Sequence, residues 1–468
     1  MTDRFEIIPL RELLQIILNQ LDKKNSLLGI TSGLFFKPKE NDPFRIKRFG
    51  QLLETPIGVA AGPHTQLAQN LVAAWITGAR FMELKTVQTL DELKVSKPCI
   101  DMQDEGYNCE WSQELKIKQS FEQYLDAWII IHILQDKFGR QYDEPGVIFN
   151  MSVGYDFAGI MQENVQWFFN KMSDASEELN QKLLEIKDIY PRVTRLKINP
   201  QISDNITLST MHGCPPDEIE KIGAYFLREK GLHTTIKLNP TLLGKEELHA
   251  ILGNSGFETE VPDLAFEHDL KYPEALRIIA NLKKLATEKQ LFFGLKLTNT
   301  LESRNHKDIF PPNEEMMYMS GRALHPISVN LARKLQNEFD GKLNISFSGG
   351  ADAFNTPDLI ACGLFPVTVC SDILKPGGYG RLYQYIEVLQ KAFAETGAKD
   401  TNDFIAEKSG LSHAGLNEQQ LHNLNRYADK TLTEEHYKRT GLRAPDIKTA
   451  RPLGYFDCIY APCVDTCP

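Results

Sequence analysis

Three cysteines lie close together at the C-terminal end of the printed sequence. Cys458, Cys463 and Cys467 are spaced C-x4-C-x3-C-P. Thiolates at such short spacing bind zinc or iron–sulfur clusters, and a Cys-Pro ending is typical of bacterial iron–sulfur segments. A structural zinc site or a cluster normally takes four ligands, so this set is incomplete. We expect residues 451–468 to open an iron–sulfur segment that a longer polypeptide or a partner chain completes; a tail with fortuitous thiols is the alternative.

A second set of chemically useful residues stands at the ends of short apolar runs. Six runs end in small or polar residues, namely Ala61 and Gly62, Lys85 and Thr86, Lys237, Thr298 and Asn299, Gly349 and Gly350, and Cys370 and Ser371. Small residues let a flat ring approach the backbone, and glycines before a short helix present N–H groups to a phosphate. Each feature also has a plain structural explanation, because strand-end lysines are usually solvated and paired glycines usually form turns.

The runs that carry these residues alternate with helical patterns. Eight apolar, β-branched runs occur at residues 56–61, 80–85, 146–151, 205–210, 233–238, 291–297, 343–348 and 365–370. Amphipathic segments such as SFEQYLDAWIIIHILQDKF lie between most of them. Eight strand–helix units across residues 50–395 predict a (β/α)8 TIM barrel, an α/β fold whose active site lies at the carboxyl ends of the strands. A doubly wound sheet is the alternative.

The residues on either side of the barrel have other patterns. Residues 1–49 have helical and extended character, and residues 396–450 are helical and polar without strand-like runs. We therefore expect an N-terminal segment, the barrel and a small helical appendix, followed by the cysteine-rich segment.

Several strings resemble a known family of flavin enzymes. ETPIGVAAG, ELKTV, TTIKLNPTL, KLTNT and ISFSGGADAFNTPDLIACGLFPVTVCSDIL are similar to the FMN-binding barrel of dihydroorotate and dihydropyrimidine dehydrogenases. As a whole, the chain resembles the N-terminal part of long flavin and iron–sulfur proteins that carry a selenate reductase label. The resemblance covers about residues 50–390 and resumes at 458–468, where CIYAPCVDTCP is similar to the cluster motif that opens their glutamate-synthase-like half.

The resemblance implies where the ring of FMN would lie. Ala61 and Gly62 would pass the ring, while Lys85 and Thr86 would line its edge. Lys237 would lie near N1 and O2, where reduced flavin is negatively charged, and a fixed ammonium group in a dry site stabilises such an anion.

The resemblance also implies contacts to the rest of the cofactor. Thr298 and Asn299 would contact the ring or the ribityl chain. The phosphate-binding amides would come from Gly349, Gly350, Cys370 and Ser371.

The fourth run departs from that family at the position of its proton donor. In the dihydropyrimidine enzymes this strand ends in Asn-Leu-Ser-Cys and the cysteine is the general acid, whereas here Thr210 ends the corresponding TLST. Cys214 lies four residues further on, near His212, and a Cys or His delivers a proton when its pKa is near neutral. Thr210, His212 and Cys214 are therefore the candidate catalytic residues. The alternative is that CPPDE is a turn that leads into a helix.

Charge and hydropathy exclude some partners. The formal net charge is −10 and no Lys/Arg-rich run is present, which disfavours nucleic acid. The longest apolar stretch, AWIIIHIL, is far shorter than the ~20 residues that a membrane helix needs, so we expect no membrane span. The N-terminal residues form no secretory signal, which predicts a reducing, cytoplasmic location.

Three functional classes follow from these observations. The first is an FMN-dependent oxidoreductase that transfers electrons between a small-molecule substrate and iron–sulfur clusters, with a downstream or partner iron–sulfur/FAD/NAD(P)H module. The second is a barrel without chemistry of its own, acting as a scaffold or docking subunit of a redox complex. The third is an aldolase in which Lys85 or Lys237 forms a Schiff base. The terminal cysteines argue against the third class, and the missing thiol after Ser209 is consistent with the second.

Overall fold

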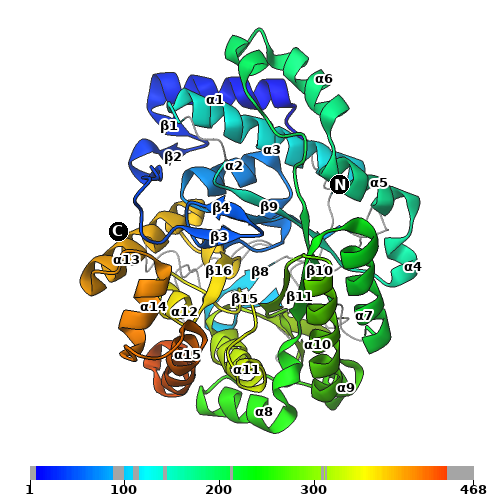
Figure 1. Ribbon diagram of the computed structural model, residues 1–468, viewed down its shortest axis with the longest axis vertical. Coiled ribbons are helices and arrows are strands. Elements are labelled where there is room, and N and C mark those ends of the chain that lie inside the picture. The colour runs from blue at the N-terminus through cyan, green and yellow to red at the C-terminus, as the bar shows by residue number, and fades with distance from the viewer. Residues whose placement is uncertain are drawn as a thin grey trace, which may run out of the picture.

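Eight parallel strands form a closed barrel (Figure 1). The computed structural model describes residues 7–87, 100–108, 115–140, 145–210, 214–306, 310 and 314–439. In chain order the barrel strands are β5 (Ile57–Val59), β6 (Phe81–Glu83), β9 (Ile148–Val153), β10 (Asn205–Ser209), β11 (His233–Leu238), β12 (Phe293–Leu297), β15 (Ile345–Phe347) and β16 (Leu364–Val369). They coincide with the eight predicted runs, so the predicted TIM barrel is confirmed and a doubly wound sheet is wrong.

The strands follow one another around the barrel in chain order, and β16 closes it by pairing with β5. Part of the interior is polar. Glu83 on β6 lies in register with Asn150 on β9, whose amide donates to Asn205 at 2.7 Å and accepts from Thr207 at 2.7 Å. All four side chains are buried, and the hydrogen bonds among Asn150, Asn205 and Thr207 offset the cost of removing these three from water.

Helices surround the barrel, most of them following a barrel strand (Figure 1). In α10 the buried residues recur every three or four positions, which places one apolar face against the strands. No helix in the described part of the chain is long and apolar enough to cross a membrane. The helices are α1 (Leu10–Lys24), α2 (Ala68–Ile76), α3 (Ile117–Lys137), α4 (Phe157–Ile160), α5 (Glu163–Ser173), α6 (Ser176–Ile186), α7 (Pro216–Tyr225), α8 (Lys245–Asn254), α9 (Asp263–His268), α10 (Tyr272–Glu288), α11 (His325–Glu338), α12 (Thr356–Ala361), α13 (Arg381–Thr396), α14 (Thr401–Ser409) and α15 (Leu416–Thr433).

A hairpin covers the amino ends of the barrel strands. Phe49, at its turn, stacks on His233 with ring centres 5.2 Å apart and meets Phe292 edge-on at 5.0 Å. Both partners stand at the starts of barrel strands, so the hairpin closes this end. The hairpin consists of β3 (Ile46–Arg48) and β4 (Gln51–Leu53), and a smaller one consists of β1 (Ser26–Leu27) and β2 (Ile30–Thr31).

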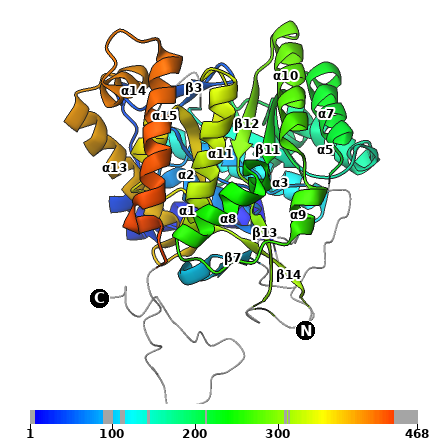
Figure 2. The ribbon, with the colours of Figure 1, turned by 90° about the horizontal axis from the view of Figure 1, so that it is seen from below.

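A second sheet lies at the other end of the barrel, where the barrel strands finish (Figure 2). Its strands run in the order β13-β14-β7-β8, and β13 begins shortly after the carboxyl end of β12. The strands are β7 (Ile100–Asp101), β8 (Tyr107–Asn108), β13 (Leu301–Arg304) and β14 (Met316–Met319). The sequence did not predict this sheet, whose strands belong to the loops after β6 and β12.

The helices after the barrel pack firmly against it. Phe404 of α14 stacks on Phe393 of α13 with ring centres 4.2 Å apart. The amide of Asn423 on α15 donates to the carbonyls of Ala361 and Ile405 at 2.8 and 3.0 Å. Figure 2 shows α15 alongside α11. That residues 396–450 form a separate appendix stays a prediction.

Candidate functional site

The carboxyl ends of β10, β11 and β12 bring predicted site residues together. The Thr210 hydroxyl donates to the backbone carbonyl of Lys237 at 2.7 Å. The side-chain amide of Asn299 donates to the Thr210 carbonyl and to the side chain of Asn239, both at 2.8 Å. These bonds fix three strand ends relative to one another. The predicted residues Thr210, Lys237 and Asn299 therefore share one corner of the barrel mouth.

Positive charge is concentrated around this mouth. Lys85 is buried at the end of β6, and Lys237 is half-buried at the end of β11. Burial lowers the pKa of His64 to about 4, and the charges of Lys85 and Lys296 lower it further. His64 is therefore neutral at neutral pH, and Lys85 and Lys296 lie near it. Such a mouth favours a bound anion.

The first and eighth strand ends meet at His64. Ala61 and Gly62 are buried, and the Gly62 N–H donates to the Thr65 hydroxyl at 3.1 Å, which forms a tight turn. The sulfur of Cys370 lies 3.7 Å from His64 Nδ1. His64 Nε2 is buried and has no hydrogen-bond partner among the described residues. A buried ring nitrogen without a partner is expected at a ligand site.

Three more predicted residues are held through their hydroxyl groups. Each bonds to a serine on a different element at 2.9 to 3.0 Å. The pairs are Thr86 with Ser152, Thr298 with Ser328, and Ser371 with Ser320.

Close packing explains the two glycines after β15. A Cβ at Gly349 would lie 2.1 Å from Ser328 Oγ, and the Gly349 N–H already donates to the Leu297 carbonyl at 3.2 Å. Gly350 has φ +63°, and a Cβ there would lie 2.5 Å from the Gly321 carbonyl oxygen. Both glycines let the loop after β15 approach its neighbours. Phosphate binding by their amides stays a prediction, and for Gly349 that amide would have to exchange its present partner.

We expect Gly350→Ala to lower the free energy of unfolding by about 1–3 kcal/mol, because a side chain would be strained at this φ and would press on the Gly321 carbonyl. Urea unfolding followed by circular dichroism measures this loss. Gly253→Ala, in helix α8 with nothing within 4 Å, is the matched control and should keep or raise stability. Equal stabilities of the two variants would contradict the packing argument.

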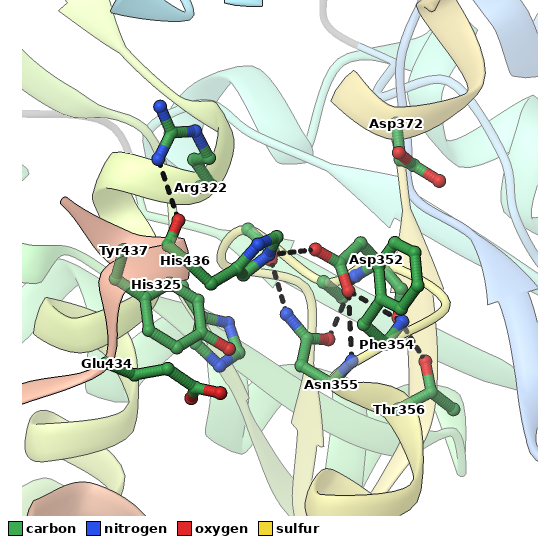
Figure 3. Close-up of polar contacts among 12 residues, drawn as sticks. Arg322, His325, Asp352, Phe354, Asn355, Thr356, Asp372, Glu434, His436 and Tyr437 are labelled. Atoms are coloured by element: carbon green, nitrogen blue, oxygen red, sulfur yellow. Dashed lines mark hydrogen bonds and ion pairs between the residues drawn. The ribbon is translucent and has the colours of Figure 1, made fainter. Parts of the chain in front are cut away.

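Asp352 ties the same loop to the residues after α15 (Figure 3). Its carboxylate accepts from the backbone N–H groups of Phe354 and Asn355 at 2.8 and 2.9 Å, and lies 2.7 Å from His436 Nε2. Arg322 donates to the His436 carbonyl at 2.7 Å. The chain segment that follows α15 is thus fastened beside the loop after β15.

A buried aromatic cluster strengthens this attachment. His325 Nδ1 lies 2.8 Å from the Gly349 carbonyl, and its Nε2 lies 2.7 Å from the Tyr427 hydroxyl. Tyr437 stacks on the His325 ring at 4.8 Å and bonds to the Tyr427 hydroxyl at 3.0 Å. Because burial lowers the pKa of His325 to about 4, the ring is neutral at neutral pH.

The His436–Asp352 pair should make stability depend on pH. The hydrogen bond to Asp352 raises the pKa of His436 above 6.5; burial acts to raise the pKa of Asp352, but bonds from His436 and Asn355 bring it below 3.8. The stabilisation by His436 is complete below its ordinary pKa and disappears as pH rises through the raised value. The stabilisation by Asp352 disappears as pH falls through its lowered value. As pH rises above 6.5, the melting temperature should therefore fall less steeply in His436→Gln than in the parent; parallel curves would refute this.

The proposed proton donor Cys214 lies two residues before helix α7. Its thiol is half-buried, 3.9 Å from the Pro215 carbonyl. Burial raises its pKa to about 11, and the charges of Glu218 and Asp156 act in the same direction. The thiol therefore keeps its proton at neutral pH and is a weak acid. Proton donation by Cys214 stays a prediction, as does a role for Thr210, whose hydroxyl is engaged.

Some predicted residues lie outside the described part of the chain. They are His212, Cys458, Cys463 and Cys467. Within the described ranges, no group of three or more His, Cys, Asp or Glu residues could hold a metal ion.

Sequence reasoning missed a buried ion pair inside the barrel. Lys296 on β12 contacts the carboxylate of Glu83 on β6, and their side chains are 2% and 0% exposed. It also missed Asn239 and gave no role to His64. The signal for Glu83 was its place two residues before Lys85, since alternate residues of a strand share a face.

A closed eight-stranded barrel with polar residues gathered at the carboxyl ends of its strands defines a TIM-barrel domain. The chain belongs to the family described as "Oxidoreductase YgfK, N-terminal TIM-barrel domain", whose model matches residues 28–439. Two YgfK proteins, from Escherichia coli K12 and O157:H7, are each named as a proposed oxidoreductase. Each is 42% identical over 487 aligned residues, which cover 100% of this chain and 45% of the relative. The chain thus spans less than half the length of these relatives.

Solved structures share the fold at low sequence identity. Ligand-free DHODH from Eimeria tenella has a TM-score of 0.51 and 16% identity, and covers 81% of this chain and 95% of its own. DHODH from the same organism in complex with ferulenol has the same score and identity over 88% and 98%. At this identity the likeness extends to the fold alone. It agrees with the TIM-barrel fold that the sequence predicted.

Proposed function

We propose that this domain is an FMN-dependent oxidoreductase module. The observation that carries the proposal is the corner at which Thr210, Lys237, Asn239 and Asn299 are bonded together at the barrel mouth. The ends of three adjacent strands supply an ammonium group, two side-chain amides and a hydroxyl. Membership of an oxidoreductase family and a fold shared with DHODH support the same conclusion.

The residues present fit a flavin. Lys237 and Lys85 would face the edge of the ring that becomes negative on reduction, and Asn299 and Thr298 would contact the ring or the ribityl chain. The buried, unpartnered His64 Nε2 gives a further polar contact at the mouth. Gly350 and Ser371, on adjacent strand ends, would hold the phosphate.

A bound flavin supplies the exchange of two electrons with a substrate and of single electrons with a cluster. The protein residues hold it and compensate its charge. Lys237 would place its ammonium group at the ring edge. The hydrogen bond from Thr210 to the Lys237 carbonyl fixes the backbone from which this side chain extends. Preorganised charge of this kind needs no rearrangement during the reaction.

The electron partner of this module is, in our proposal, an iron–sulfur centre that begins at Cys458, Cys463 and Cys467. Their spacing fits a cluster segment whose other ligands come from a longer polypeptide or a partner chain. The length of the YgfK relatives, of which this chain covers 45%, leaves room for such a module.

Calorimetric titration of the purified chain with FMN and with riboflavin tests the proposal. We expect FMN to bind at least about tenfold more tightly, because the phosphate adds charge-assisted hydrogen bonds. Equal affinities would contradict the proposed phosphate site. Failure of both compounds to bind would contradict the proposed flavin site. Trapping by borohydride with a carbonyl substrate would instead indicate the aldolase class.

A further inference from the structure

The ion pair between Glu83 and Lys296 bridges the barrel. β6 and β12 are four strands apart in either direction around the ring, so they stand on opposite walls. The two side chains meet in the interior and are almost completely buried. Removing two charges from water is costly, and replacing such a pair with apolar residues often stabilises a protein. A need for structural stability therefore does not by itself account for this pair.

The pair is close in the fold to residues of the proposed flavin site. Glu83 stands two residues before Lys85 on the same strand, and Lys296 is in register with Lys237 on the adjacent strand. Lys296 also interacts electrostatically with Cys370 and with His64 at the mouth. The ionisable groups around the Lys296 ammonium are therefore Glu83 from β6, Lys85 after β6, His64 after β5, Cys370 after β16 and Lys237 from β11; β15 contributes the neutral Ser346.

Burial and direct contact make the protonation of the pair sensitive to any charge placed nearby. Burial lowers the pKa of Lys296 to about 7, and the charge of Cys370 acts in the opposite direction. The carboxylate of Glu83 in contact favours the ammonium form. In such a coupled pair the protons belong to both groups together. The pair is neutral with one shared proton and carries one positive charge with two.

We propose that the Glu83–Lys296 pair takes up one proton when flavin bound above it is reduced, and thereby sets how the reduction potential depends on pH. The inference rests on the proposed flavin site. Two electrons and one proton enter the ring, which Lys85 and Lys237 keep anionic. One further proton from solvent enters the pair, whose charge changes from zero to +1. This proton uptake compensates the negative charge of the reduced ring. Burying an uncompensated charge in the barrel would cost free energy.

Spectroelectrochemical titration of the FMN-loaded full chain across the neutral pH range tests this inference. The slope of the midpoint potential against pH gives the number of protons taken up for each electron. We expect two protons for two electrons in the parent. In the double variant Glu83→Leu, Lys296→Leu, which removes both charges together, we expect the slope to fall to half.

A second buried ion pair provides the matched control. Arg80 and Glu54 are 0% and 3% exposed, and their contact lies at the amino end of β6, away from the mouth. Glu54→Gln, which perturbs this pair, should lower stability without changing the slope. A halved slope in this control would show that the effect is not specific to Glu83 and Lys296, and would overturn the inference.

The parent protein alone can also overturn the inference, so its falsification does not depend on the double variant folding. A parent slope of one proton for two electrons at neutral pH contradicts the inference while leaving FMN binding intact. A parent that takes up no FMN overturns the inference together with the proposed function.

Discussion

Lys296→Met is expected to lower the free energy of unfolding by about 3–5 kcal/mol, because it leaves the Glu83 carboxylate unpaired inside the barrel. Urea unfolding at neutral pH, followed by circular dichroism, measures this change. The loss should shrink as pH falls, since a protonated Glu83 carries no charge to bury.

Two variants make this prediction specific to the buried charge. The double variant Glu83→Leu, Lys296→Met should recover much of the lost stability, because no charge remains unpaired. Lys342→Met removes a lysine whose partner Asp340 is 79% exposed, and should change stability by less than about 0.5 kcal/mol. If Lys296→Met unfolded at the same urea concentration as Lys342→Met, the pair would not be buried as the structure has it.

Lys237→Met should weaken FMN binding about 10- to 100-fold, the effect of removing one charged hydrogen-bonding group from a ligand site. The substitution spares the backbone, because Thr210 bonds to the Lys237 carbonyl and not to its side chain. Fluorescence titration with FMN gives the dissociation constants.

The same control serves here, since Lys342→Met also removes one lysine charge but lies before β15, at the amino end of the barrel. Its FMN affinity should match that of the parent. Equal affinities of Lys237→Met and Lys342→Met would mean that the flavin, if it binds, does not contact the corner at Lys237.

The barrel could be predicted from the sequence because each of its strands is a local apolar run. The runs that became β9 and β11 are six buried or half-buried residues each, and helical patterns separate them. The second sheet could not be predicted in this way. Its strands are two to four residues long, and β14 pairs with β7, so Met319 lies opposite Asp101 across more than two hundred positions of sequence. No local pattern encodes such a pairing.

The site was predictable where polar residues stand at or just after the end of a strand. Lys237 is the last residue but one of β11, Asn299 follows β12, and the structure brings them into one corner with Thr210. Glu83 and Lys296 were missed because each is a single charge within its own apolar run. The two side chains meet only because the sheet closes into a barrel, which places β6 and β12 on opposite walls. His64 was missed for a similar reason, because its neighbour Cys370 is brought to it by the pairing of β16 with β5.

The two glycines after β15 have a packing role that the sequence did not indicate. The paired glycines after β15 fit a phosphate loop in sequence, yet Gly349 and Gly350 also make close contacts with Ser328 and Gly321. An aspartate at Gly350 would therefore disrupt the loop whether or not a phosphate binds there. Substitution of Lys237 is the cleaner test, because the bond from Thr210 reaches the Lys237 backbone carbonyl and is kept when the side chain is changed.

The flavin stoichiometry of the purified chain tests the central claim most directly. The chain is saturated with FMN, freed of excess by gel filtration, and the visible absorption is compared with the protein concentration. One FMN for each chain in the parent and in Lys342→Met, with clear loss in Lys237→Met, is the predicted result. A colourless parent, or full retention by Lys237→Met, would contradict a flavin site at this barrel mouth.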